Sequence, residues 1–243
     1  MRIDRVQEKT KAKEILRTSK PSMLLAGMYY VLLSAVIAWL SLRLTGVDND
    51  TAVKMMEAAN SGNTDAVMTM MNRSMPTPAA SLLDVLLHMA LSVVGVGLTL
   101  FVLNSIRNNS PALGNLLDGF GMLPRLLALL IMESLLVFLW SLLLLIPGII
   151  AIYRYRFAVY LLLDHPEYSA LDCIRRSKEM TNGFKEQLFL LDLSFLPWAI
   201  ACLLPGIGYL VEIFFVPYRE TVKALYYEHV RMDRSEAGGI EYV

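Results

Sequence analysis

The sequence contains little charge, little cysteine and little histidine. Asp, Glu, Lys and Arg make up only 18% of its 243 residues, whereas soluble domains average about 25%. The 22 basic and 22 acidic side chains cancel, so no basic field marks a nucleic-acid-binding protein. The two cysteines, Cys173 and Cys202, are too few for a disulfide framework, and neither belongs to a CxxC motif. We expect both thiols to stay unpaired.

The common catalytic motifs are missing as well. The sequence has no HExxH, no GxSxG, no Walker A loop and no GxGxxG. Its three histidines, His88, His165 and His229, are far apart in sequence and favour structural roles. We therefore expect a protein that is not an enzyme and has no catalytic, cofactor-binding or metal-binding residues.

Long apolar runs are the main feature that the sequence does have. Hydrophobic residues make up 56% of the chain, and the mean hydropathy is +0.50. A helix needs about 20 apolar residues to cross a bilayer. The runs that approach this length are 23–42, 82–106, 126–146, 148–163, 188–204 and 207–230. They predict an all-α, polytopic membrane helix bundle of about six spans with short interfacial helices, in which residues 23–230 form the membrane domain.

The polar segments predict elements outside the bilayer. Residues 1–22 are rich in Lys and Arg and predict a basic amphipathic segment on the cytoplasmic surface. Residues 43–80 predict an outer loop with two short helices. Residues 164–187 predict a cytoplasmic helix, because Ser169 and Asp172 have the spacing of a capping box. We expect residues 231–243 to be a flexible tail.

The outer loop 43–80 is unusually rich in methionine, with Met55, Met56, Met68, Met70, Met71 and Met75. Thioether sulfurs select Cu(I), so a copper site is one interpretation of this composition. The other is an adaptable apolar face packed on the bundle or on the bilayer surface. No histidine or cysteine lies in the loop to complete a metal site. We therefore favour the apolar face.

The distribution of Lys and Arg predicts that both termini are cytoplasmic. With six spans, the cytoplasmic pieces are 1–22, 107–125, 164–187 and 217–243, and they carry 17 of the 22 basic residues. Cytoplasmic loops of membrane proteins are enriched in these residues. The fourth and sixth runs are short or charged. If either only re-enters the membrane, the span count falls while residues 1–20 stay cytoplasmic.

Two stretches, 124–163 and 188–230, resemble each other. Six residues separate Trp140 from the turn Pro147-Gly148-Ile149, and six separate Trp198 from Pro205-Gly206-Ile207. Each turn is followed by a Tyr-Arg pair, Tyr155-Arg156 or Tyr218-Arg219, and then by an acid-His pair, Asp164-His165 or Glu228-His229. Membrane bundles often contain internal repeats, so we predict a duplication. The alternative is chance matching between leucine-rich segments.

Six ionisable residues lie in or beside the apolar runs and form the candidate charge cluster: Glu133, Arg154, Arg156, Asp192, Glu212 and Arg219. An unpaired charge in a span costs about 2.5–3.5 kcal/mol on insertion scales, so such residues pair with one another or line a wet cavity. Counting from the two turns puts Arg154 and Glu212 at one depth, as an outer layer. The same counting predicts an inner layer of Glu133 and Asp192 with Arg219 or Arg156.

Several short motifs resemble a family of bacterial integral-membrane proteins, domain-of-unknown-function family 975. The first are Ile146-Pro-Gly-Ile-Ile150, Tyr153-Arg-Tyr155, Tyr160 and Asp164-His-Pro166. The later ones are Ala170-Leu171, Ile174-Arg-Arg-Ser177, Met180, Leu190-Leu-Asp-Leu-Ser-Phe195 and Pro217-Tyr218. The chain departs from the family pattern at Leu196-Pro197-Trp198, where an aromatic-Gly pair is common. The resemblance implies a multi-pass protein of the bacterial cytoplasmic membrane, with no established reaction and no catalytic residue to transfer.

Three functions remain open at this stage. The first is a non-enzymatic scaffold or partner in envelope or transport assemblies, which we favour. The second is a small-solute or lipid transporter with a polar cavity around Arg154, Glu212, Glu133 and Asp192. The third, a membrane enzyme, is disfavoured by the missing motifs. Expected partners are the lipid bilayer and either a membrane protein or a second copy of the chain, with no nucleic acid. A water-accessible cavity that reaches Arg154 would favour transport, and a fully packed charge cluster would favour a scaffold.

Overall fold

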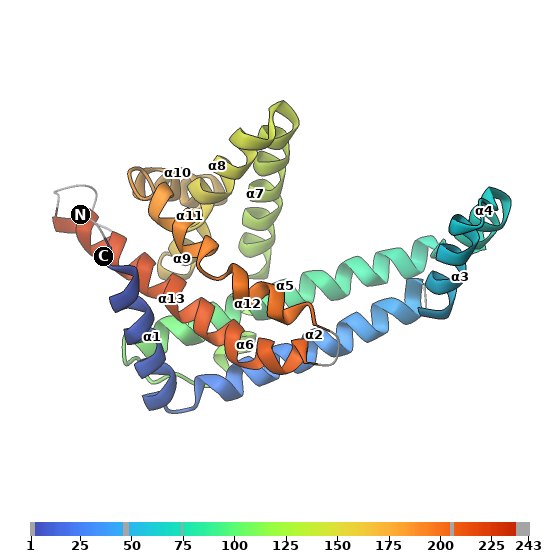
Figure 1. Cartoon of the computed structure of the whole chain (residues 1–243). Coiled ribbons are helices and arrows are strands. Elements are labelled where there is room, and N and C mark those ends of the chain that lie inside the picture. Colours follow the sequence, from blue (N-terminus) through green and yellow to red (C-terminus); the bar gives the residue numbers. More distant parts are fainter. Residues whose placement is uncertain (1–2, 46–48, 74, 205–206, 237–243) are drawn as a thin grey trace. The chain divides into compact units, whose positions relative to one another are not determined.

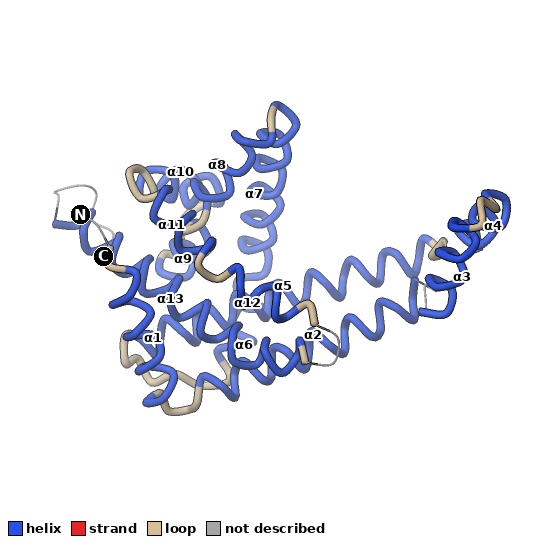
Figure 2. The backbone as a smooth tube through the Cα atoms, in the orientation of Figure 1, coloured by secondary structure: helices blue, strands red, loops and turns tan. Residues whose placement is uncertain are grey.

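The computed structural model describes residues 3–45, 49–73, 75–204 and 207–236, and every regular element within them is a helix (Figures 1 and 2). The first helices are α1 (Arg5–Thr18), α2 (Met23–Thr45), α3 (Asn49–Asn60), α4 (Thr64–Arg73), α5 (Pro78–Ile106) and α6 (Asn115–Asp118). A 3₁₀ turn, η1 (Gly119–Met122), leads into α7 (Leu123–Leu143), α8 (Leu145–Tyr155) and α9 (Ala158–Asp164). The last are α10 (Ala170–Met180), α11 (Lys185–Leu193), α12 (Leu196–Cys202) and α13 (Gly208–Glu236). The predicted all-α class is confirmed.

Four helical segments in the described part of the chain are long and apolar enough to cross a membrane. They are Met23–Leu44, Pro78–Ile106, Asn115–Leu143 and Ile146–Asp164. The prediction of about six spans is not confirmed. The fifth run is divided into α11 and α12, of 9 and 7 residues, and this stretch carries three charged residues, Lys185, Glu186 and Asp192. The sixth lies in α13, where Arg219, Glu220 and Lys223 interrupt the apolar sequence.

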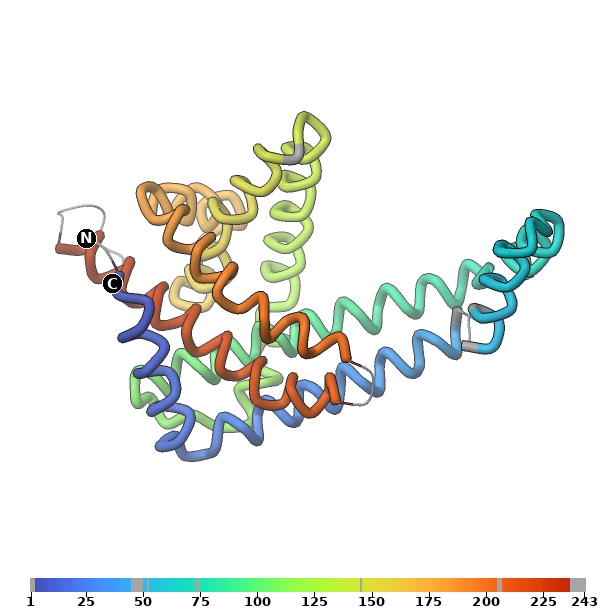
Figure 3. The backbone as a smooth tube through the Cα atoms, viewed as in Figure 1, coloured from blue at the N-terminus to red at the C-terminus, as the bar shows by residue number. Residues whose placement is uncertain are grey.

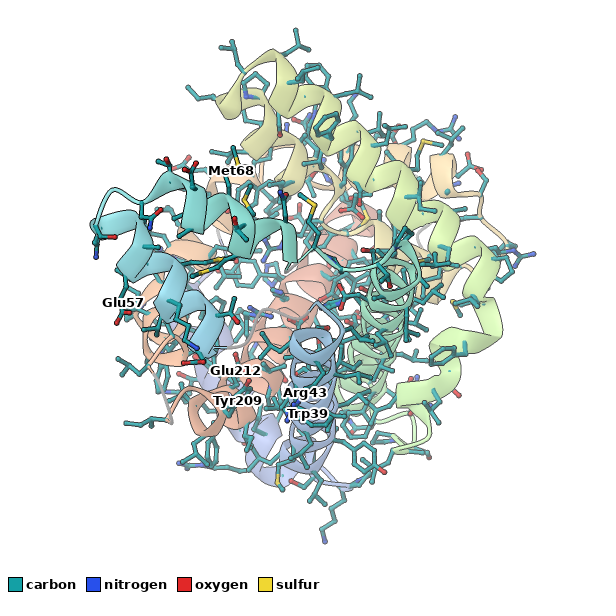
Figure 4. All side chains as sticks on the ribbon, turned by 90° about the vertical axis from the view of Figure 1, so that its right-hand side faces the viewer. Trp39, Arg43, Glu57, Met68, Tyr209 and Glu212 are labelled. Atoms are coloured by element: carbon teal, nitrogen blue, oxygen red, sulfur yellow. The ribbon has the colours of Figure 1, made fainter. Side chains whose placement is uncertain are left out.

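The chain forms two compact units, one of Tyr30–Ser92 and the other of Met1–Tyr29 with Val93–Val243. Within the first unit, Gly62 adopts a φ of 72° in the turn between α3 and α4. The Arg43 guanidinium lies over the Trp39 ring at 5.4 Å near the end of α2 (Figure 4). Met56 and Met68 are exposed, so their apolar surface is turned outward from this unit.

The second unit contains the predicted repeat, and Figure 3 follows its course from α7 to α13. The chain reverses after α7 at Leu144, which is extended, and α8 packs back along α7. A break at Arg156 and Phe157 separates α8 from α9. In the second half the corresponding break falls before the turn, between α11 and α12, and Pro217 lies inside the continuous helix α13. Pro205 and Gly206 of the second motif lie outside the described residues, and the duplication stays a prediction.

The N-terminal segment is a helix held on this same unit. The Asp4 side chain accepts hydrogen bonds from the backbone N–H groups of Val6 and Gln7, which starts α1. The helix packs on α13, with Ala12 fully buried. Lys9 Nζ donates to Ser194 Oγ at 2.7 Å after α11. The basic segment is therefore fixed against the C-terminal helices.

Local signals placed several boundaries correctly and one incorrectly. Ser169 caps α10, because its side chain accepts from the Asp172 N–H, as predicted. Gly183 follows with a φ of 87°. Ser110-Pro111 has the pattern of an N-cap followed by proline at the first helical position, but α6 begins only at Asn115. The expected tail from residue 231 is helical as far as Glu236, and residues 237–243 lie outside the described part of the chain.

Candidate functional site

A four-charge network, which we call the boundary network, joins the end of α5, the end of α9 and the last turns of α13. Its members are Arg107, Asp164, Glu228 and Arg231. Arg107 donates from both terminal nitrogens to the two Asp164 carboxylate oxygens, at 2.7 and 2.9 Å, and from Nε to Glu228 at 2.7 Å. Arg231 lies 3.4 Å from Asp164 and 3.0 Å from Glu228. The Tyr227 hydroxyl donates to Asp164 at 2.7 Å.

The boundary network balances its own charge. It has two cations and two anions, and both acidic side chains are only 8% exposed. Burial alone would lower the pKa of Arg107, but the hydrogen bond and charge of Asp164, with the charge of Glu228, outweigh it and raise that pKa above its usual range. Arg107 therefore stays charged. Such fork-shaped pairing fixes orientation as well as distance.

A second group of charges lies between α8, α11 and α13. Arg156 donates from both terminal nitrogens to the Asp192 carboxylate, at 2.5 and 2.7 Å, and the Tyr153 hydroxyl donates to the same carboxylate at 3.2 Å. On α13, Lys223 lies 2.8 Å and Arg219 3.3 Å from Glu220 Oε1. Burial would raise the pKa of Glu220, but the charges of Lys223 and Arg219 hold it below its usual range.

A cavity of about 260 Å³ adjoins this second group. Its polar lining is Arg156, Asp192, Arg219 and Lys223, and its apolar lining is Phe195, Leu196, Ala199 and Phe215. We call it the α12 cavity, because α12 supplies one wall. Three basic side chains and an apolar surface border this cavity.

Residues 141–234 match the model of a family described as a protein of unknown function, DUF975. The chain carries a DUF975 segment. The match confirms the resemblance to family 975 over these residues. No curated protein and no solved structure matches the chain.

The DUF975 segment contains the whole α12 cavity and most of the boundary network. Arg107 lies outside it, on α5, and its two acidic partners lie inside it. The segment is thus joined to a preceding helix through buried ion pairs. The two acids also occupy corresponding positions in the two halves of the predicted repeat, in the motifs Asp164-His165 and Glu228-His229.

The predicted charge cluster is only partly gathered in the structure. Arg156 and Asp192 meet as described, and Arg219 lies on the same cavity. In the described part of the chain no ion pair joins Arg154 to Glu212, and none is formed by Glu133. The Arg154 guanidinium instead lies 6.0 Å from the Trp140 ring on α7. Glu212 lies one turn after Tyr209 in the apolar first half of α13 (Figure 4).

The sequence did not single out Arg107, Tyr227 or Arg231 as site residues. One signal was available, because the repeat placed an acid-His pair at the end of each half. Arg107 gave a weaker signal, as the first charge after a long apolar run. Nothing in the sequence showed that all of them meet at one point, since 121 residues separate Arg107 from Glu228.

Metal and thiol chemistry find little support in the geometry. Among the described residues, no three His, Cys, Asp or Glu side chains are close enough together to hold a metal ion. Cys173 and Cys202 are free thiols. Burial raises the pKa of Cys173 to about 11, so this thiol is protonated and unreactive at neutral pH.

Proposed function

We propose that the chain is a bacterial cytoplasmic-membrane protein with four spans and both termini in the cytoplasm. An even number of spans leaves the two termini on the same side. Residues 1–22 carry seven Lys and Arg, whereas residues 45–77 carry only Lys54 and Arg73. Residues 165–243 carry eight, namely Arg175, Arg176, Lys178, Lys185, Arg219, Lys223, Arg231 and Arg234. The enrichment of Lys and Arg in cytoplasmic segments supports this orientation.

Within that topology the protein acts as a non-enzymatic scaffold in an envelope or transport assembly. The boundary network is the observation that carries this proposal. Its four charges satisfy one another, so none is left free to accompany a moving solute. They also tie α5, α9 and α13 into one fixed arrangement, and a fixed arrangement is what a docking platform requires.

A transporter for a small solute or a lipid is the second candidate, and the α12 cavity favours it. The sequence predicts that the polar cavity of such a transporter lies around Arg154, Glu212, Glu133 and Asp192. Of these, only Asp192 is among the residues that line the cavity. Because the cavity is lined by one of the four predicted residues, it supports a binding site better than it supports a transport route across the bilayer. We therefore rank the scaffold first.

Site-specific photocrosslinking tests the scaffold. A photoreactive amino acid replaces Leu171, Arg175 or Lys178, which are exposed on α10. The matched control replaces Glu14, which is exposed on α1. We expect α10 positions to give discrete protein adducts in living cells, and the same protein to co-purify with the wild-type chain in mild detergent. An adduct of twice the chain mass would identify a second copy as the partner.

The opposite outcome is also well defined. If no α10 position gives a reproducible adduct, and purified protein in liposomes moves a labelled lipid or solute, the scaffold proposal is wrong and the transporter replaces it. Empty liposomes and the variant Ala199→Phe, which fills the α12 cavity, are the controls for that transport measurement.

A further inference from the structure

The α12 cavity has an excess of positive charge. Arg156, Arg219 and Lys223 line it, and the acids that neutralise them are Asp192 and Glu220. Three cations facing two anions leave one positive charge uncompensated. A buried or half-buried excess charge is costly unless a counterion is bound. An anionic group in the cavity would remove that excess.

The rest of the cavity lining is apolar, and apolar surface continues outside it. Phe195, Leu196 and Ala199, at the start of α12, line the space together with Phe215, whose ring contacts that of Phe195. Beyond the cavity, Leu203 is 81% exposed and Phe214 is 59% exposed. From Arg219 and Lys223 toward the start of α13, and onto α12, the surface therefore changes from charged to apolar. An amphiphile has this same change between its headgroup and its chains.

Along α13 the cavity lies at the level of the start of the first span. The Thr221 hydroxyl of α13 contacts Met23 Sδ at 3.3 Å, and Met23 is the first residue of that span. A Cβ added to Gly27, one turn further along, would lie 2.7 Å from Pro217. Arg219 and Lys223 flank Thr221, so they lie at the level where the apolar run begins. Lipid phosphates occupy the corresponding level of a bilayer.

The volume limits which part of a lipid could enter. Pockets that enclose drug-sized ligands measure about 300–1,000 Å³. At about 260 Å³ the α12 cavity can hold a headgroup and cannot hold acyl chains as well. The chains would have to lie on the exposed apolar surface of α12 and early α13.

We propose that the α12 cavity binds the phosphate of an anionic phospholipid, with Arg219 and Lys223 contacting the phosphate and the acyl chains lying along α12. Arg156 holds the floor of the site through its paired contact with Asp192. This inference does not depend on the scaffold role, because a bound lipid is compatible with a scaffold and with a transporter.

Native mass spectrometry of the full-length chain in detergent tests the proposal. The probes are dioctanoyl phosphatidylglycerol, dioctanoyl phosphatidylcholine and inorganic phosphate. We expect phosphatidylglycerol to bind at least about tenfold more tightly than phosphatidylcholine, because both lipids carry the phosphate but the choline ammonium would add a positive charge beside Arg219 and Lys223. Inorganic phosphate at the same concentration should not displace the lipid.

Three variants locate the binding to the cavity. Arg219→Gln removes one cation and leaves Lys223 on Glu220, so we expect a folded protein with about tenfold weaker phosphatidylglycerol binding. Ala199→Phe fills the cavity without changing its charge and should weaken binding similarly. Lys178→Gln removes an exposed charge from α10 and should leave binding unchanged.

Three results would overturn the proposal. One is equal phosphatidylglycerol binding by wild type, Arg219→Gln and Ala199→Phe. Another is equal binding of the zwitterionic and anionic lipids. The third is full displacement of the lipid by inorganic phosphate, which would make the ligand a free phosphate ion. If Arg219→Gln fails to fold, the charge-neutral variant Ala199→Phe alone decides whether the lipid occupies the cavity.

Discussion

Arg107 is the residue on which the boundary network depends. Its planar guanidinium binds both oxygens of Asp164 and at the same time donates from Nε to Glu228. A lysine has one point charge on a flexible stem and cannot reproduce that fork. The chemistry of this position therefore demands arginine specifically, rather than any cation.

We expect Arg107→Gln to destabilise the protein by about 3 kcal/mol, because it leaves two buried carboxylates with only Arg231 and Tyr227 to satisfy them. Thermal unfolding in detergent measures this loss. Arg107→Lys should restore only part of it. The control is Arg175→Gln, whose ion pair with Asp172 is largely exposed, and it should change stability by less than about 1 kcal/mol. Equal effects at the two positions would contradict a structural role for the network.

Only some of the charged contacts could be predicted from the sequence, and helix geometry explains which ones. Pairing by depth assumes straight helices that rise 1.5 Å per residue. Arg156 follows the last residue of α8 at the break before α9, where its side chain reaches Asp192 on α11. Arg154 lies before the break, and its side chain lies near Trp140 instead. Counting residues from the proline turn does not show where a helix breaks. The sequence therefore could not distinguish the two arginines.

At the scale of elements, close backbone contact fixes how α5 and α6 pack. Gly97 lies against the backbone of Leu116, and a Cβ added there would be 2.2 Å from the Leu116 carbonyl oxygen. Gly97 belongs to a group of small residues, with Ser92, Gly95 and Thr99, of the kind that permit close helix approach. The sequence alone could not show which helix would approach, since the contact depends on the irregular segment between residues 107 and 114.

We predict that Gly97→Ala destabilises the protein by about 1–3 kcal/mol, because α6 would have to move to admit one methyl group. Gly114→Ala is the matched control, as nothing lies within 4 Å of a Cβ at that position and its φ of −58° suits alanine. Thermal unfolding of both variants in the same detergent gives the comparison. If the two substitutions have the same effect, the close approach of α6 to α5 is not present in the folded protein.

Short-range signals identified other elements more reliably than the long apolar runs did. The capping box of Ser169 and Asp172 and the glycine at position 183 bracket α10 because they act within a few residues. The run 188–204 reads as one span by hydropathy alone, yet the chain turns at Ser194 and Phe195. Phe195 is buried there against Phe215 and Tyr218, so tertiary packing overrides the apolar length.

At the scale of the whole molecule, the number of spans decides which side of the membrane holds the turn between α12 and α13. Six spans would put this turn outside the cell, whereas four spans keep it on the cytoplasmic side of the membrane. Leu203, at the end of α12, is 81% exposed and is therefore well placed to report the difference. The prediction of cytoplasmic termini is common to both counts and cannot separate them.

Single cysteines in a Cys-free background separate the two topologies. Thr64→Cys, Leu203→Cys and Ser235→Cys are each treated in intact cells with a membrane-impermeant thiol reagent, and again after the membrane is permeabilised. We expect position 64 to be labelled in intact cells and position 235 only after permeabilisation, because three spans separate α4 from the C-terminal end of α13 and an odd number places them on opposite sides. Position 203 should behave as position 235 does. Labelling of 203 in intact cells would restore the six-span topology, and labelling of 235 but not 64 would reverse the orientation.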